Sequence, residues 1–133
     1  MKITQIFLIV FISCLTVRAA EMPNDRADKI ADAIYKIENS QKWPYGIKSV
    51  VIRGNTQAER KAYARRICIN TIKNNYCRWQ LAGATNDFLV FLSDIYCPTK
   101  GNNLTVAERT CNKYWLSNLR RVLKDTYAPN KKM

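Results

Sequence analysis

Apolar residues recur at three- and four-residue spacing near the start of the chain, which predicts an amphipathic helix over residues 25–39. The apolar positions are Ala27, Ile30, Ala31, Ile34 and Ile37. These positions share one face of an α-helix. Pro23-Asn24 precedes the helix, and acidic residues occupy its first turn, where the helix dipole favours them. Glu38 lies four residues after Ile34 and seven after Ala31, so it continues the apolar face.

Glu38 stands where this helix meets a turn that contains Pro44 and Gly46. A carboxylate on an apolar face is expected to be partly desolvated, which favours its protonated form. A carboxylic acid that stays protonated near neutral pH can act as a general acid. The alternative is a glutamate that turns to solvent at the helix end, which is the usual fate of this residue type. Without the residues that follow Glu38, the pattern favours that alternative.

Three further helices are predicted from capping signals and apolar patterns. Thr56-x-x-Glu59 is a capping box that opens a long helix, and Gly83 ends this helix after about residue 82. Residues 86–96 are nearly apolar all round, so this helix is expected to be the central, buried one. Thr105-x-x-Glu108 is a second capping box, which opens a helix that reaches about residue 124. Val50-Val51-Ile52 indicates a short extended piece between the first two helices.

The first part of the chain has the features of a secretion signal. Lys2, an apolar run over residues 6–12 and the small-residue pattern Val17-Arg18-Ala19 predict a signal peptide at residues 1–19. Lipidation at Cys14 is less favoured than simple cleavage. The apolar run is too short to span a membrane comfortably. We therefore expect an exported protein, periplasmic or secreted.

The length of the chain predicts one domain. The sequence has 133 residues and no internal repeat. Residues 20–124 suffice for a single compact, mainly α domain with a minor extended element. Residues 125–133 are predicted to form a basic, flexible tail.

Composition limits the chemistry that the chain can perform. The chain has no histidine, which excludes a Ser-His-Asp triad, a Cys-His dyad and a His-ligated zinc site. We expect neither a metal nor a cofactor. The net charge of +12 favours an anionic partner such as nucleic acid, a membrane surface or an acidic polymer. Because the predicted signal peptide directs the chain out of the cytoplasm, no nucleic acid is expected, and acidic cell-wall polymers fit better.

Four cysteines follow the predicted signal peptide, and an even number in a small exported domain predicts disulfides. Cys68 and Cys77 are nine residues apart on one predicted helix, a rise of about 13 Å. They cannot bridge each other, and Cys97 and Cys111 cannot then be the other pair. A reversal of the chain at Gly83 would place Cys68 beside Cys97. We therefore expect the disulfides Cys68–Cys97 and Cys77–Cys111, each contributing ~2–4 kcal/mol.

Aromatic and amide side chains provide candidates for sugar binding. Ring faces stack on sugars, and amides bind hydroxyl and acetamido groups. Trp79, Tyr96 and Trp115 fall on predicted helices, where a role in the core is more common. Tyr45 lies in the turn after Glu38 and is the best candidate for a cleft.

A second catalytic carboxylate is not visible near Glu38. The next acidic residue along the chain is Glu59, so no close pair of carboxylates of the retaining type can be seen in the local sequence. Either Glu38 acts alone, or a partner such as Asp87 or Asp94 comes from elsewhere in the fold.

Several segments together resemble the lysozyme-like superfamily, in particular small soluble lytic transglycosylases. In those proteins a catalytic Glu ends a helix and an aromatic turn follows, as in Ile37-Glu38-Asn39-Ser40 and Pro44-Tyr45-Gly46-Ile47. Residues 65–72, residues 87–98 and Asn112-x-x-Trp115-x-x-Asn118-Leu119 also look like compact phage-type members. The similarity covers about residues 27–123. The Gly-Leu-Met-Gln and Ala-Tyr-Asn-Gly-like segments of typical transglycosylases are absent, which leaves the substrate register and the cleavage mode open.

The resemblance implies a lysozyme-like fold and cleavage of the MurNAc–GlcNAc β-1,4 bond of peptidoglycan. Glu38 would protonate the leaving glycosidic oxygen, and its conjugate base would then activate the substrate's 6-hydroxyl or a water. The protein would act as a monomer on the glycan strands of peptidoglycan. The substrate-contacting residues would be Ser40, Tyr45, Ser49 and Tyr96. The alternative is a non-enzymatic, secreted cationic protein that binds the cell wall or a protein partner on the same scaffold. A third hypothesis, binding of nucleic acid, rests on charge alone.

Overall fold

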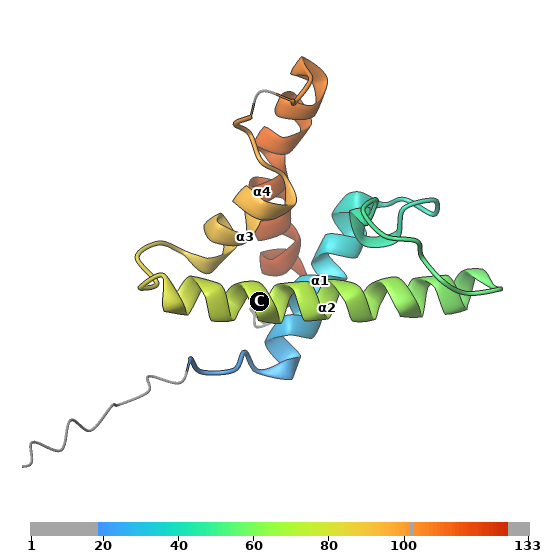
Figure 1. The fold of residues 1–133 in the computed structure, drawn as a ribbon, viewed down its shortest axis with the longest axis horizontal. Helices are drawn as coiled ribbons and strands as arrows, with labels where there is room; N and C mark the ends of the chain where they lie inside the picture. The colour runs from blue at the N-terminus through green and yellow to red at the C-terminus, as the bar shows by residue number, and fades with distance from the viewer. Residues whose placement is uncertain (1–18, 102, 128–133) are drawn as a thin grey trace, which may run out of the picture.

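The computed structural model describes residues 19–101 and 103–127 and is mainly α-helical, as predicted. Its elements are α1 (Asn24–Glu38), the 3-10 turn η1 (Pro44–Gly46), α2 (Gln57–Leu81), α3 (Phe88–Tyr96) and α4 (Val106–Tyr127). The long helix α2 crosses α1, and α3 and α4 lie together on one side of α2 (Figure 1). Of the predicted signal peptide, residues 1–18 lie outside the described residues, and so do residues 128–133 of the predicted tail.

Both predicted capping boxes form. Thr56 Oγ1 accepts a hydrogen bond from the Glu59 N–H at 3.1 Å, and Glu59 Oε2 accepts one from the Thr56 N–H at 3.2 Å. Thr105 and Glu108 make the same reciprocal pair, at 3.2 and 2.8 Å. These bonds satisfy N–H groups that have no acceptor inside the helix. The helices α2 and α4 therefore begin where the sequence predicts, although α4 continues to Tyr127, into the predicted tail.

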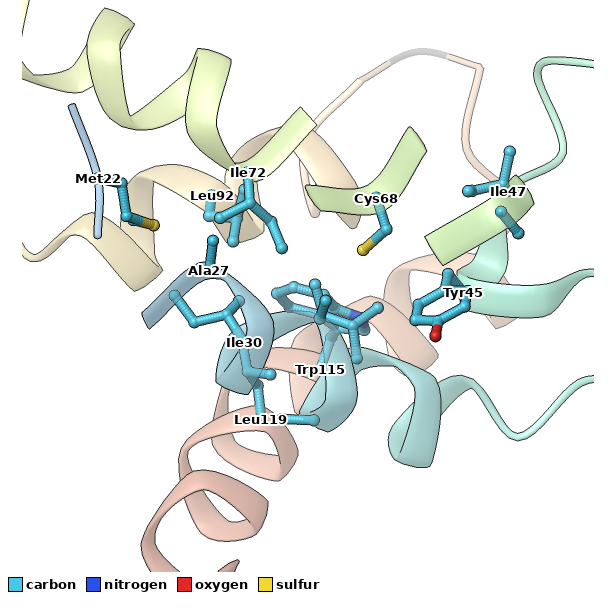
Figure 2. Packing of buried hydrophobic residues seen from close by; sticks show 14 of the residues in the cluster. Met22, Ala27, Ile30, Tyr45, Ile47, Cys68, Ile72, Leu92, Trp115 and Leu119 are labelled. Atoms are coloured by element: carbon cyan, nitrogen blue, oxygen red, sulfur yellow. The ribbon is translucent and has the colours of Figure 1, made fainter. Parts of the chain in front are cut away.

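The centre of the core is α1, whereas the sequence pattern placed residues 86–96 there. Five residues of α1 are buried: Ala27, Ile30, Ala31, Ala33 and Ile34. In α3 only Phe88 and Leu92 are buried, and Ile95 is 44% exposed. The reason is that α1 contacts α2, η1 and α4, whereas the short α3 contacts α2 and α4 and leaves its remaining face to solvent. Side chains from all four α-helices meet in one cluster (Figure 2).

Arg65 of α2 joins two acidic residues of α1. Arg65 Nη1 donates to Asp28 Oδ1 at 2.8 Å, and Nη2 donates to Asp32 Oδ1 at 3.1 Å. Asp28 and Asp32 are one helical turn apart, so one guanidinium reaches both. Burial disfavours the charge of Arg65, but the two hydrogen bonds outweigh it and raise the pKa of Arg65. Both aspartates are about half exposed, at 45% and 46%, so this contact lies at the solvent-facing edge of the packing between α1 and α2.

The segment between η1 and α2 is irregular, and within the described residues it forms no strand. Ile52 is buried, but Val51 is 84% exposed. The Ile52 carbonyl accepts a hydrogen bond from Arg60 Nη1 at 3.1 Å instead of from a neighbouring strand. The predicted extended piece at residues 50–52 therefore has no neighbouring strand to pair with among the described residues and is a loop. No helix of the described residues is long and apolar enough to cross a membrane.

The predicted disulfides are not supported, because all four described cysteines are free thiols. Cys68 is buried, and its Sγ accepts a hydrogen bond from the Tyr96 hydroxyl at 3.3 Å. Successive helical residues point about 100° apart, so Tyr96 takes the position facing Cys68 that Cys97 was predicted to hold. Cys97 instead lines the same cleft as Cys111, whereas Cys77 borders a separate hollow. Neither Cys68–Cys97 nor Cys77–Cys111 is therefore a bonded pair in the structure.

Candidate active site

A cleft of about 770 Å³ lies between the end of α1 and the N-terminal half of α4. In Figure 1 these segments are the cyan end of α1 with the turn after it, and the orange part of α4. One wall comes from Glu38, Gly46 and Lys48. The opposite wall is a stripe of α4 side chains at three- and four-residue spacing: Glu108, Cys111, Asn112, Trp115 and Asn118. The volume falls within the range of about 300–1,000 Å³ that is usual for ligand-binding clefts.

Glu38 is held in this cleft by Trp115. The Trp115 Nε1–H donates a hydrogen bond of 2.9 Å to Glu38 Oε1, although the two residues are 77 positions apart. Trp115 is 6% exposed and stacks on Tyr96, with ring centroids 5.4 Å apart and planes inclined by 17°. Within the described residues, no hydrogen bond reaches Glu38 Oε2. The carboxyl group therefore has one oxygen anchored by a rigid donor and one without a protein partner.

Gly46 packs its backbone directly against this carboxyl group. A Cβ atom at position 46 would lie 2.7 Å from Glu38 Cδ and 2.8 Å from Oε2. Gly46 also has φ +69°, a left-handed conformation that favours glycine. Both the space and the backbone conformation therefore require glycine beside Glu38.

The turn that follows Glu38 is built by left-handed residues and one serine. Asn39 adopts φ 41° and its N–H donates to the Tyr35 carbonyl at 3.1 Å, which ends α1 at Glu38. Ser40 Oγ accepts a hydrogen bond from the Trp43 N–H at 3.0 Å. Ser40 borders a different hollow, with Gln41 and Lys61. The structure thus gives Ser40 a role in the turn and places it outside the cleft.

Tyr45 lies in the core and not in the cleft where the sequence placed it. Its side chain is 1% exposed, and its ring centroid is 5.0 Å from that of Tyr35. Tyr45 has φ 60°, and this left-handed conformation is not visible in the sequence pattern. Burial raises the pKa of Tyr45 to about 12. The predicted sugar contact at Tyr45 is therefore corrected: the residue packs between α1 and α2.

Tyr96 and Ser49 lie on or next to the cleft. Tyr96 lines it, and its hydroxyl is directed to Cys68 Sγ. Burial raises the pKa of Tyr96 well above its usual range, so the phenol stays neutral. Ser49 is exposed and borders a smaller hollow of about 280 Å³ that shares Gly46, Lys48 and Tyr96 with the cleft. The cleft is thus adjacent to a second hollow, and ligand contacts by Tyr96 and Ser49 remain predictions.

The second carboxylate on the cleft is Glu108, and neither Asp87 nor Asp94 lines it. Asp87 caps α3 through the Leu89 N–H at 2.8 Å and pairs with Arg120 at 2.8 Å. Glu108 Oε2 accepts hydrogen bonds from the Thr105 N–H and hydroxyl, both at 2.8 Å. The bond from the Thr105 backbone is the main cause that lowers the pKa of Glu108. Glu108 is therefore charged at neutral pH and already engaged in its capping box.

Sequence reasoning missed the most informative partner of Glu38. Trp115 was assigned to the core, and it is buried, but its indole N–H reaches the carboxylate. The signal that could have found it is Asn112-x-x-Trp115-x-x-Asn118, whose spacing puts all three residues on one helix face. All three line the cleft, as do the missed residues Lys48 and Tyr114. Asn112 Nδ2 also donates to the Pro98 carbonyl at 2.8 Å, which fixes the connection before α4.

Comparisons of the chain with protein-family models, with curated proteins and with solved structures find no match. Among the described residues, no group of three or more Cys, Asp and Glu side chains is placed to hold a metal ion.

Proposed function

We propose that the protein is an exported enzyme with a lysozyme-like domain that cleaves peptidoglycan, with Glu38 as its general acid and base. The observation that carries this proposal is the Glu38 carboxyl group in a cleft, with Oε1 held by Trp115 and Oε2 without a hydrogen-bond partner among the described residues. A proton donor must be held rigidly within reach of the leaving oxygen, and the indole N–H provides that restraint. The sequence resemblance to lytic transglycosylases around Glu38 supports the same assignment.

In the proposed mechanism Glu38 Oε2 donates its proton to the glycosidic oxygen as the bond to the MurNAc anomeric carbon breaks. The carboxylate that results keeps its hydrogen bond from Trp115, which stabilises the negative charge. It then removes a proton from the 6-hydroxyl of the same MurNAc residue, whose oxygen attacks the anomeric carbon and forms an anhydro sugar. A water in place of that hydroxyl gives hydrolysis instead.

Because Glu108 is already held in its capping box, attack by the substrate's own 6-hydroxyl is favoured over a mechanism that needs a second carboxylate. A separate carboxylate nucleophile or base would have to face the sugar from the other side, and the only other carboxylate lining the cleft in the described residues is held by Thr105. With one free carboxyl group, the neighbouring 6-hydroxyl of the substrate is the simplest nucleophile. We therefore favour lytic transglycosylase over muramidase activity.

Other groups on the cleft suit an acidic glycan. Asn112 and Asn118 present amide groups, and Tyr114, which is 55% exposed, presents an aromatic ring. Amides match acetamido and hydroxyl groups, and a ring stacks on a sugar face. Lys48 places a positive charge at the rim, and the excess of Lys and Arg over Asp and Glu in the chain attracts the carboxylates of the wall.

Mass spectrometry of peptidoglycan treated with the purified protein tests this proposal. We expect a series of muropeptides that end in anhydro sugars. Products with reducing ends would change the assignment to hydrolysis. If no muropeptide is released while the protein sediments with the wall, the alternative of a cationic wall-binding protein, which the charge of +12 favours, replaces the enzyme.

A further inference from the structure

Two of the four described cysteines, Cys97 and Cys111, line the wall of the cleft. Cys97 follows α3 directly, Cys111 lies in the second turn of α4, and both line the cleft. The residues that follow them are joined, since Asn112 Nδ2 donates to the Pro98 carbonyl at 2.8 Å. The two chain segments that carry the thiols are therefore held side by side.

The electrostatics of Cys97 agree with this placement. The pKa of Cys97 is raised to about 12, mainly by burial; Glu38 and Cys111 contribute to the rise, and Lys48 lowers it. The charges of Cys111, Glu38 and Lys48 act on the Cys97 thiol because all three residues line the same cleft.

We propose that Cys97 and Cys111 form a disulfide across the wall of the cleft when the chain meets an oxidising disulfide donor. The bond would close a ring of residues 97–111 that includes Leu104, Ala107 and Glu108 of the cleft wall. Cross-links of this loop size restrict the unfolded chain and stabilise the folded state. The disulfide would also hold the α4 side chains that line the cleft in place relative to Tyr96, the residue before Cys97.

The other two cysteines are placed where they stay reduced. Cys68 is fully buried, and its Sγ is bound by the Tyr96 hydroxyl. Cys77 borders a separate hollow lined by Asn70 and Lys73 of α2 and by residues 19–21. This pairing differs from the one expected from the sequence, in which each cysteine at the cleft was joined to a cysteine of α2.

The chemistry is thiol–disulfide exchange with a donor such as oxidised glutathione. Cys111 is exposed and reacts first: its thiolate attacks one sulfur of the donor and releases one glutathione thiolate. The Cys97 thiol then gives up its proton as its sulfur attacks the Cys111 sulfur, and the second glutathione leaves as a thiolate that takes up a proton. The two protein thiols lose two protons and two electrons, and the donor gains the electrons.

Peptide mapping tests this pairing directly, because trypsin places the four described cysteines in four different peptides. The peptides are residues 67–73, 74–78, 79–100 and 110–113, for Cys68, Cys77, Cys97 and Cys111. The purified chain is incubated with oxidised and reduced glutathione, its remaining thiols are alkylated with N-ethylmaleimide, and it is then digested. We expect peptide 79–100 linked to peptide 110–113, with the other two peptides alkylated. Any other linkage, or four alkylated peptides, would overturn the proposal.

Thermal unfolding with two variants provides an independent measurement. Oxidation should raise the Tm of the wild-type chain and of Cys77→Ser by roughly 5–15 °C. The Tm of Cys111→Ser should not change on oxidation, because the exposed partner is missing. Equal shifts in Cys111→Ser and Cys77→Ser would contradict the assignment. Neither measurement depends on the proposed enzymatic activity.

Discussion

The indole of Trp115, near the middle of α4, donates a hydrogen bond of 2.9 Å to the carboxyl group of Glu38 at the end of α1. The contact joins two helices that are far apart in sequence and fixes the Glu38 carboxyl group, which, unlike Glu108, makes no capping bond. Trp115→Phe keeps an aromatic ring but removes the donor, so peptidoglycan cleavage should fall about 10–100-fold.

Trp79→Phe is the matched control for that substitution. Trp79 Nε1 donates to the Asn86 carbonyl at 2.9 Å, and Trp79 does not line the cleft. Both variants should lose unfolding free energy, about 1–3 kcal/mol for Trp115→Phe and about 0.5–1.5 kcal/mol for Trp79→Phe. Only Trp115→Phe should lose activity. Full activity in Trp115→Phe would show that the indole N–H is not needed to position Glu38.

Gly46→Ala should displace the Glu38 carboxyl group, because the added Cβ atom would lie 2.7 Å from Glu38 Cδ. The left-handed φ adds strain of about 1–3 kcal/mol. Gly83→Ala is the control: its φ is +92°, but its added Cβ would meet nothing nearer than 3.7 Å. Denaturant unfolding should show a loss of stability in both variants, whereas release of muropeptides should be lost only in Gly46→Ala. Equal activity of the two variants would refute the packing argument.

The helices of this fold could be predicted because their signals are local. The Thr56-x-x-Glu59 and Thr105-x-x-Glu108 boxes act within one turn, and both form as expected. Which of the helices is buried most deeply could not be predicted in the same way. Apolar content says how much of a helix can be buried, but not how many neighbours cover it, and α1 has more neighbours than α3.

The candidate site could be predicted only in part. Glu38 follows from the helix pattern and the turn, but Tyr45 turns inward through a left-handed φ that its sequence does not signal. Trp115 is 77 residues from Glu38, so no local pattern pairs them. The predicted disulfides find no support in the structure for a similar reason: the reversal at Gly83 brings α3 to α2, but the side chain that reaches Cys68 is Tyr96.

Alkaline pH should destabilise the protein through Cys68. Burial raises the pKa of Cys68 from its usual 9.0 to about 11, against the lowering effect of its hydrogen bond from Tyr96. The folded state therefore holds the thiol proton more tightly than the unfolded chain does. This contribution is complete below about pH 9 and is lost as the pH rises through about 11, to an extent of up to ~2–3 kcal/mol.

Urea unfolding between pH 8 and pH 11 measures this effect under reducing conditions. Cys68→Ala should be less stable at every pH because it leaves a cavity, but its stability should fall less steeply above pH 9. Cys77→Ala, at a partly exposed position, should keep the wild-type slope. The prediction fails if Cys68→Ala and the wild type show parallel curves.

Lys48 should contribute to the capture of an acidic glycan, since it lies exposed at the rim of the cleft. Lys48→Gln should raise KM about 2–5-fold with little change in kcat, and the difference should shrink in high salt. Lys100→Gln removes an exposed charge outside the cleft and is the control. A loss in kcat with KM unchanged would place Lys48 in the chemical step and contradict this role.

Glu38→Gln provides the most direct test of the central claim, that Glu38 is the acid and base of a peptidoglycan-cleaving site. The variant should sediment with peptidoglycan as the wild type does, but its release of muropeptides should fall by at least ~10²-fold. Glu108→Gln changes the other carboxylate of the cleft and can keep its capping box, so it should cleave within a few-fold of the wild type. If Glu38→Gln releases muropeptides at the wild-type rate, Glu38 is not the catalytic group and the account is wrong.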